Sequence, residues 1–434
     1  MIGIAISWWG AVLGLVLAIV LILKKVNAVY ALFAGSLIGG VVGGASLNQT
    51  VTVIINGTNS VMPAVVRVLT AGILAGVLIE SGAAEKIAET IVEKLGEKKA
   101  LLAIALATLI ITAVGVFVTV AIIIVAPIAL SVAKRVGISK TAVLLTMVGG
   151  GKAGNVMSPN PNTIAVAKGF NLELTQVMIA GFIPALVGLI VTCIVGKLLS
   201  EKGTQIKDSD LVVKKTSDND NEEKPSFLKA MVAPIVAIVL LGINPIGSIL
   251  NIEFLKKISI DSMIILPVAG LVGLVAMGKA KNILKYTASG LNMMSSTAIL
   301  LIGAGSIAGI ISNSNLSSIV VNIIKTSGIS GTLLAPISGI LMAAATGSTS
   351  TGAILATGSF EKAILAMGVA PISAAVMVHT GAVVIDHLPH GNFFLVSAQS
   401  VKMDISDRMK LIPYESIVGG SICLTATVIY GFLM

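Results

Sequence analysis

Charged and aromatic residues are scarce in this sequence of 434 residues, at 11% and 4% of the total, whereas 56% of it is hydrophobic. Soluble domains carry about 25% charged residues, so this composition excludes most of them. Cysteine is also rare, and both copies, Cys193 and Cys423, lie inside apolar stretches. We therefore expect two small packing residues and no disulfide.

The net charge of +9 comes from basic residues in short segments beside apolar stretches. This placement is typical of the cytoplasmic loops of membrane proteins and argues against nucleic acid as a partner. Apolar runs of roughly 18 residues or more recur along the chain, which predicts an all-α, multi-pass protein in a lipid bilayer. Lys24 and Lys25 follow the first run, whereas a cleaved signal peptide carries its charge before that run. We expect this run to remain as a first membrane helix, with the N- and C-termini outside.

Clusters of Pro, Asn and Gly interrupt two membrane-length apolar stretches. The first cluster runs from Gly154 to Thr163 and the second from Asp386 to Asn392. Their prolines at 159 and 389 are 230 positions apart (389 − 159 = 230). Lipid offers backbone groups no hydrogen-bond partners, so a broken helix survives there around a polar cavity inside the protein. Paired breaks in two halves of a chain are typical of the binding site of a secondary transporter.

The two halves match at other positions as well. Thr119 aligns with Thr349 and Gly137 with Gly368, and the basic residues give the halves opposite orientations in the membrane. We therefore predict two inverted repeats, each with a re-entrant helical hairpin and a broken transmembrane helix. The expected first repeat covers 1–199, with a hairpin at 100–135 and a broken helix at 140–168; a solvated cytoplasmic linker covers 200–229; the second repeat covers 230–434, with a hairpin at 331–366 and a broken helix at 370–398.

Two further expectations concern the segments between the spans. Residues 48–60, between apolar spans at 28–44 and 62–79, are rich in Asn and Thr and predict an outer loop. Lys402, Arg408 and Lys410 mark a cytoplasmic segment before the last span, because positive charge favours that side of the membrane.

Polar residues at the hairpin tips and at the breaks are the candidates for substrate binding. A tip is the start of a helix, whose free N–H groups and dipole attract anions, and hydroxyl groups there can bond a carboxylate or a cation. Asn side chains at the breaks replace lost backbone partners, and Lys152 is a candidate counter-charge, with extension to a membrane surface as the alternative. The candidates are Thr119, Lys152, Asn155, Ser158, Asn160, Asn162, Thr163, Ser348, Thr349, Ser350, Thr351 and Asn392.

All three histidines of the chain lie within or just before the second break. Ionisable residues inside a membrane are costly and usually functional, and His titrates near physiological pH. The candidates for ion coupling are therefore His379, Asp386, His387 and His390. The alternative is that one or two of these histidines satisfy freed backbone groups. Asp386, His387 and His390 are also metal ligands by type, but no metal-binding motif accompanies them, so we expect no metal.

The chain resembles the gluconate:proton symporter (gluconate permease) family, within the ion transporter superfamily, over nearly its whole length. The residues that carry this resemblance are Ser158-Pro159-Asn160-Pro161-Asn162-Thr163 and His387-Leu388-Pro389-His390-Gly391-Asn392-Phe393-Phe394-Leu395-Val396. The family typically has a His at the first break, which this chain lacks, whereas its second break has gained two histidines.

The resemblance implies proton-coupled symport of a small organic anion, such as gluconate, glycerate or another hydroxy acid, across a prokaryotic cytoplasmic membrane, with no cofactor. It also implies a homodimer in which a fixed scaffold carries an elevator-like transport domain made of the hairpins and broken helices. Na⁺ is the alternative coupling ion, and a Na⁺/H⁺ antiporter on the same scaffold is the alternative function. An enzyme is not expected, because the sequence lacks a recognisable nucleophile–base or metal constellation.

Overall fold

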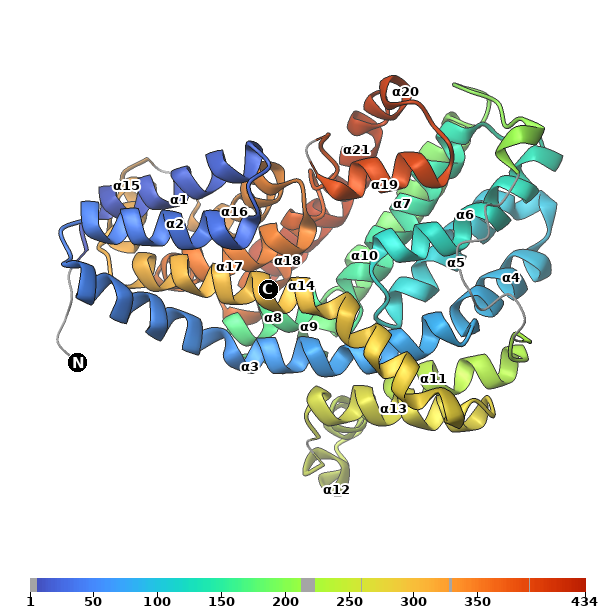
Figure 1. Ribbon diagram of the computed structural model, residues 1–434, viewed down its shortest axis with the longest axis horizontal. Helices are drawn as coiled ribbons and strands as arrows, with labels where there is room; N and C mark the ends of the chain where they lie inside the picture. Colours follow the sequence, from blue (N-terminus) through green and yellow to red (C-terminus); the bar gives the residue numbers. More distant parts are fainter. Residues whose placement is uncertain (1–5, 212–222, 259, 328–329, 390) are drawn as a thin grey trace.

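The computed structural model describes residues 6–211, 223–258, 260–327, 330–389 and 391–434, and helices dominate it (Figure 1). Helices of the first half are α1 (Trp8–Leu23), α2 (Ala28–Val42), α3 (Leu47–Glu80), α4 (Ala83–Leu95), α5 (Ala100–Ala113), α6 (Val118–Arg135), α7 (Lys140–Val156), α8 (Pro161–Gly169), α9 (Leu174–Ala180) and α10 (Phe182–Leu198). Helices of the second half are α11 (Phe227–Ile249), α12 (Glu253–Lys256), α13 (Ser262–Ala276), α14 (Ile283–Ser312), α15 (Leu316–Ser327), α16 (Leu334–Thr346), α17 (Thr349–Ala366), α18 (Pro371–Ala382), α19 (Asn392–Ser400), α20 (Ile405–Met409) and α21 (Ile412–Thr427).

Several of these helices suit a membrane. In the described ranges, five helices are long and apolar enough to cross one, and α9 with α10, which meet at 41°, would make a sixth span. On α10, the large apolar side chains of Ile190, Ile194 and Leu198 are exposed and share one face of the helix. Such a face is stable against lipid, which agrees with the predicted multi-pass membrane protein.

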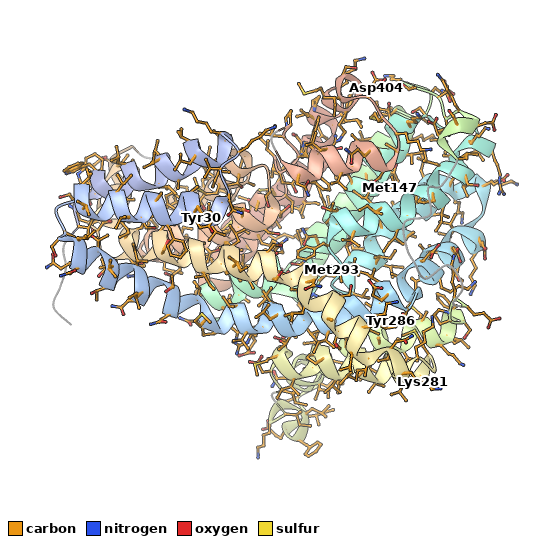
Figure 2. The ribbon with its side chains drawn as sticks, viewed as in Figure 1. Tyr30, Met147, Lys281, Tyr286, Met293 and Asp404 are labelled. Carbon is orange, nitrogen blue, oxygen red and sulfur yellow. The ribbon has the colours of Figure 1, made fainter. Side chains whose placement is uncertain are left out.

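The two longest helices, α3 and α14, run along each other through the molecule (Figure 1). Glycines allow their close contact: a Cβ on Gly57 would lie 2.3 Å from the carbonyl oxygen of Gly305, and one on Gly290 would lie 2.0 Å from that of Gly72. Tyr286, labelled in Figure 2, is fully buried on α14 next to this contact. Small residues of this kind bring the backbones of membrane helices together.

We expect Gly290→Val to force α3 and α14 apart and to destabilise the protein by about 1–3 kcal/mol or more, as overpacking does. Thermal unfolding in detergent, followed by gel filtration, measures the effect. Gly420→Val on α21 is the matched control, because no atom lies within 4 Å of a Cβ built on that residue. Superimposable melting curves for the two variants would contradict the importance of the glycine contact.

Residues 48–60 form part of α3, so the predicted outer loop is wrong. A capping box starts the helix: the Ser46 hydroxyl accepts from the Gln49 N–H (3.3 Å), and the Gln49 side chain accepts from the Ser46 N–H (2.8 Å). Thr50 and Thr52 donate their hydroxyl hydrogens to carbonyls four residues earlier (both 2.9 Å). Polar side chains that bond back to their own helix are compatible with it, and composition alone therefore misled the prediction.

The same order of elements occurs in both halves: a long helix, a short helix, a helical hairpin, a broken helix and a last helix (Figure 1). The hairpins turn at Gly115 (φ +105°) and Gly347 (φ +62°). Each hairpin is followed by another glycine of positive φ, Gly137 (+71°) and Gly368 (+84°), a conformation that glycine adopts without a Cβ clash. Re-entry of the hairpins into the membrane and inversion of the halves stay predictions.

The sequence predicts a solvated linker at 200–229. The start of this linker is not wholly solvated, because a buried ion pair holds it. The Asp210 carboxylate lies 2.9 Å from the Lys140 ammonium at the start of α7, and both side chains are buried. Lys140 also donates to the carbonyl of Lys402, after α19 (3.0 Å). Burial of the Asp210 carboxyl opposes its ionisation, but hydrogen bonds from Lys140 and from the Lys207 N–H hold its pKa below the usual value.

We expect Asp210→Asn to free residues 200–211 and to speed their hydrogen exchange several-fold at neutral pH. A carboxyl whose pKa is lowered on folding adds stability above its ordinary pKa of 3.8, and this stability is lost as the pH falls through the lower, folded-state pKa. Exchange in the wild type, corrected for its intrinsic pH dependence, should therefore rise only below that range. Glu201→Gln, at an exposed position, is the control, and equal exchange in both variants would refute the role of the ion pair.

Candidate functional site

The first break, at 157–160, separates α7 from α8 and is stabilised by asparagine side chains. The Asn160 Oδ1 accepts from the N–H groups of Asn162 (2.8 Å) and Thr163 (3.1 Å), which caps α8. The Asn160 Nδ2 donates to the carbonyl of Asn155 (2.7 Å). These four residues are buried, so the side chains replace the backbone bonds that the prolines cannot make.

The second break lies between α18 and α19 and is joined to the first half by Lys152 of α7. The Lys152 ammonium lies 2.7 Å from Asp386 Oδ1 and 2.9 Å from His387 Nδ1, and it donates to the carbonyl of Val383 (2.6 Å). Lys152 is 1% exposed and Asp386 4%. A buried ion pair thus connects two residues that are far apart in the sequence. His390 lies outside the described residues.

Both hairpins approach the same place. Ser348 caps α17, because its Oγ accepts from the N–H of Thr351 (3.3 Å), and the Thr349 hydroxyl donates to Asp386 Oδ2. The helix α17 packs against α8, and α6 packs against α19, so each hairpin contacts the broken helix of the other half (Figure 1). Two hairpin tips and two breaks therefore surround one centre.

A cavity of about 180 Å³ lies at this centre. The first residues of α6, α17 and α19 line it, so three helix N-termini meet there. The first N–H groups of a helix lack partners within the helix, and the dipole gives this end a partial positive charge. Within the described parts of the chain, Asn162 Oδ1 has no hydrogen-bond partner although the residue is buried. The lining residues are Phe117, Val118, Thr119, Asn155, Asn162, Gly347, Ser348, Thr349, Ser350, Asp386, Asn392 and Phe393.

Many of the predicted site residues line this cavity, and others lie behind its wall. Ser158, Asn160 and Thr163 support the first break, Thr351 lies in the first turn of α17, and Lys152 lies behind Asp386. His379 is fully buried in α18, where neither ring nitrogen has a hydrogen-bond partner among the described residues. The residues of the prediction that line the cavity are Thr119, Asn155, Asn162, Ser348, Thr349, Ser350, Asp386 and Asn392.

Among the lining residues that the structure describes, Asp386 alone carries a charge. The Lys152 ammonium balances this charge from behind the wall, at 2.7 Å. The cavity thus presents hydroxyl groups, amide groups and helix N-termini around a carboxylate that is already paired. Such a site can hold a small anion if further positive charge accompanies it, because burial of an uncompensated charge is very costly.

Sequence reasoning missed a second buried ion pair, between Arg408 and Glu415. The Arg408 Nη2 donates to Glu415 Oε2 (3.0 Å), its Nη1 lies 2.7 Å from Glu415 Oε1, and its Nε donates to Ser397 Oγ (3.1 Å). Both charged residues are 0% exposed, so Arg408 is not the surface charge that the sequence predicts. Glu415 Oε2 also lies 3.7 Å from His387 Nδ1, which links this pair to the Lys152–Asp386 pair. The sequence feature that could have indicated this pair is Glu415 itself, a lone carboxylate at the start of an apolar span.

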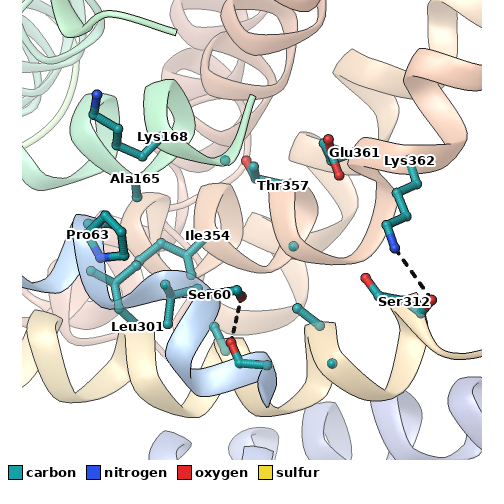
Figure 3. Close-up of a pocket in the computed structure, with 18 of the residues that line it drawn as sticks. Ser60, Pro63, Ala165, Lys168, Leu301, Ser312, Ile354, Thr357, Glu361 and Lys362 are labelled. Atoms are coloured by element: carbon teal, nitrogen blue, oxygen red, sulfur yellow. Dashed lines mark hydrogen bonds between the residues drawn. The ribbon is translucent and has the colours of Figure 1, made fainter. Parts of the chain in front are cut away.

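A second, larger cavity of about 490 Å³ lies between α3 and α14 on one side and α8 and α17 on the other (Figure 3). Lys168, Glu361 and Lys362 bring charge to its lining, and the Lys362 ammonium donates to the carbonyl of Ser312 (3.5 Å). The long helices are therefore packed loosely against α8 and α17 at this level.

Comparisons with known proteins agree with this architecture. The chain is 51% identical over 426 residues to an uncharacterized transporter of Haemophilus influenzae, with 98% of each chain covered. Its fold is similar to that of the Alcanivorax borkumensis YdaH transporter, with a TM-score of 0.62 at 13% identity, over 89% of each chain. It is also similar to Neisseria gonorrhoeae MtrF, of a class of antimetabolite efflux pumps, with a TM-score of 0.58 at 15% identity, over 89% of this chain and 85% of that one.

The model of the GntP family permeases matches residues 6–433, which is nearly the whole chain. Permeases are transporters, which fits the expectation that the chain is not an enzyme, and the family confirms the resemblance seen in the sequence. The match also accounts for the apolar helices, since a permease crosses its membrane several times. The chain belongs to the GntP permease family of multi-pass membrane transporters.

Proposed function

We propose that the chain is a secondary active symporter that carries a small organic anion together with protons across the cytoplasmic membrane. The observation that carries this proposal is the meeting of three helix N-termini at one buried cavity. Helix N-termini bind anions through free N–H groups and the helix dipole. The hydroxyl groups of Thr119, Thr349 and Ser350 and the free Oδ1 of Asn162 supply further partners for a carboxylate and its hydroxyl substituents.

The size of the cavity favours a short substrate. Its volume of about 180 Å³ lies below the roughly 300–1,000 Å³ that is usual for drug-sized ligands. Glycerate or another short hydroxy acid therefore fits the site better than the six-carbon gluconate. In this proposal, the carboxylate of the substrate meets the N-termini of α6 and α17, and its hydroxyl groups meet Asn155, Asn162 and Asn392.

The position of Lys152 favours H⁺ over Na⁺ as the coupling ion. A freed carbonyl and a carboxylate at a helix break are the ligands that a coupling cation would use. Here the Lys152 ammonium already contacts both of them, at the carbonyl of Val383 and at Asp386. Of the four residues predicted to couple ions, Asp386 and His387 are the two described members that lie in this cluster, whereas His379 lies apart from it.

An elevator mechanism is part of the proposal. The tightly packed pair α3 and α14 suits a fixed scaffold, and the hairpins with the broken helices suit the moving part, since they form the cavity together. The loose packing at the larger cavity, where α8 and α17 face the long helices, leaves room for movement (Figure 3). Opposite orientation of the two halves, a homodimer and external termini belong to the same proposal.

Uptake of radiolabelled D-glycerate into proteoliposomes tests this function, under a pH gradient and then under a Na⁺ gradient. We expect uptake with the pH gradient alone, and a loss of at least tenfold in Thr349→Ala, whose hydroxyl lines the cavity and donates to Asp386. Thr70→Ala is the matched control, because that hydroxyl bonds to Val66 of its own helix (3.1 Å). Na⁺-dependent proton movement with no anion uptake would instead support the antiporter.

A further inference from the structure

We infer that Nδ1 of His387 takes up the coupled proton, and that one proton binds there for each monovalent anion in the cavity. This inference rests on the proposed function and adds to it the protonated atom and the stoichiometry. Three features of the buried cluster carry it: the hydrogen on the other ring nitrogen, the bonds of Lys152, and the charge balance.

The other ring nitrogen of His387 has a fixed partner. Its Nε2 lies 3.0 Å from the carbonyl oxygen of Ile412 and 3.3 Å from the hydroxyl of Ser416, at the start of α21. A carbonyl oxygen only accepts hydrogen bonds, so Nε2 carries a hydrogen in every protonation state. The ring therefore gains or loses its second proton at Nδ1.

Without that proton, the hydrogen bonds of Lys152 are complete. An ammonium group has three hydrogens to donate. Around the Lys152 ammonium lie three acceptors: the carbonyl of Val383, Asp386 Oδ1 and the lone pair of His387 Nδ1, at 2.6, 2.7 and 2.9 Å. Nδ1 thus lies between a donor, the Lys152 ammonium at 2.9 Å, and an acceptor, Asp386 Oδ1 at 3.0 Å, so it can accept when unprotonated and donate when protonated.

Protonation reverses this arrangement. Nδ1–H can no longer accept from Lys152 and must donate, with Asp386 Oδ1 at 3.0 Å and Glu415 Oε2 at 3.7 Å as its acceptors. The charged groups that face the ring within the described residues are Lys152 from α7, Asp386 from the break and Glu415 from α21, with Arg408 of α20 paired to Glu415. Two cations and two carboxylates balance there, so a proton leaves an uncompensated positive charge.

An anion in the cavity supplies the missing negative charge. Asp386 forms the wall between the cavity and the cluster: its Oδ1 contacts Lys152 and His387, whereas its Oδ2 accepts from Thr349 at the cavity. The anion and the proton therefore sit on opposite sides of one carboxylate, and each offsets the electrostatic cost of burying the other. Binding of both together leaves the charge of the buried site unchanged.

Proton uptake on anion binding tests this inference directly. Purified full-length protein is titrated with D-glycerate in weakly buffered detergent solution with a pH indicator, between pH 7 and 8. We expect about one proton per bound anion and a Kd that rises about tenfold per pH unit, because each anion binds together with one proton. In His387→Gln, whose amide cannot take up a proton, both the uptake of protons and the pH dependence of Kd should vanish. His379→Gln should retain both.

Several outcomes would overturn the assignment. Wild-type binding of glycerate without proton uptake would contradict the assignment but would not contradict the proposed function. Failure of the wild type to bind glycerate or other short hydroxy acids would remove both. Proton uptake that survives His387→Gln and disappears in His379→Gln would assign the proton to the other histidine. If His387→Gln does not fold, wild-type proteoliposomes decide: coupled glycerate and proton entry should generate no current, and a current would contradict the stoichiometry.

Discussion

Replacing Asp386 with Asn is expected to lower anion uptake at least a hundredfold. The substitution removes the carboxylate that lies 2.7 Å from the Lys152 ammonium, so that a cation with 1% exposure loses its counter-charge. Removal of one partner of a buried ion pair costs about 3–5 kcal/mol. The amide of the new Asn side chain also places no negative charge between the cavity and the Lys152 ammonium. Initial rates of D-glycerate uptake, at equal amounts of reconstituted protein, measure the loss.

Asp261→Asn is the matched control for this experiment. Asp261 also pairs with a cation, since its Oδ1 accepts from Arg67 Nε (2.9 Å), but it lies at the start of α13 and is partly exposed. A partly exposed pair contributes about 0–1 kcal/mol, so uptake should change little. Wild-type uptake in Asp386→Asn would contradict a role for this carboxylate in transport.

Replacing Glu415 with Gln is expected to destabilise the protein by about 3–5 kcal/mol, because Arg408 would remain buried without its carboxylate. The Arg408 guanidinium also lies 4.7 Å from the centre of the Phe394 ring, a contact too weak to replace an ion pair. We expect the thermal transition in detergent to fall by on the order of 5 °C or more. The same melting temperature as in the wild type would show that the pair does not stabilise the fold.

A double variant separates charge from packing at this position. In Arg408→Met with Glu415→Leu, both charges are gone and apolar side chains of similar size fill the space. Such replacements of buried ion pairs are often neutral or stabilising, so much of the lost stability should return. Lys410→Gln, at a side chain that is 75% exposed, is the control and should melt like the wild type. A double variant that melts as early as Glu415→Gln would point to packing as the cause.

The sequence predicted those features of the fold whose backbone geometry depends on single residues. Gly115 and Gly347 stand at the two hairpin turns, and the Pro and Asn residues of the first break end α7 and begin α8 where the sequence predicts. Positive φ at a turn and a missing N–H at a proline depend on single residues. These signals therefore predicted which segments meet at the cavity.

The burial of charged side chains depends on how the helices pack, and the sequence did not predict it. Arg408 and Glu415 look like ordinary charges at the edge of a span, and their burial follows from how α20 and α21 fold against α19 and the second break. The same holds for Lys152: the sequence makes it a candidate counter-charge for the substrate, and the structure buries its ammonium 2.7 Å from Asp386 Oδ1. The side of a helix that faces a cavity is decided by its neighbours, not by its composition.

The order of synthesis places a demand on the first half of the chain. Lys152 and His387 are 235 positions apart, and the acidic partner of Lys152 directly precedes this histidine. At a synthesis rate of about 5–20 residues per second, roughly 10–50 seconds pass between the emergence of the lysine and that of its carboxylate. During this time the Lys152 ammonium on α7 lacks its counter-charge, and a charged group inside a membrane without a partner is costly. If the two halves were synthesised as separate chains, the Lys152 ammonium would meet its counter-charge only after the halves had associated in the bilayer.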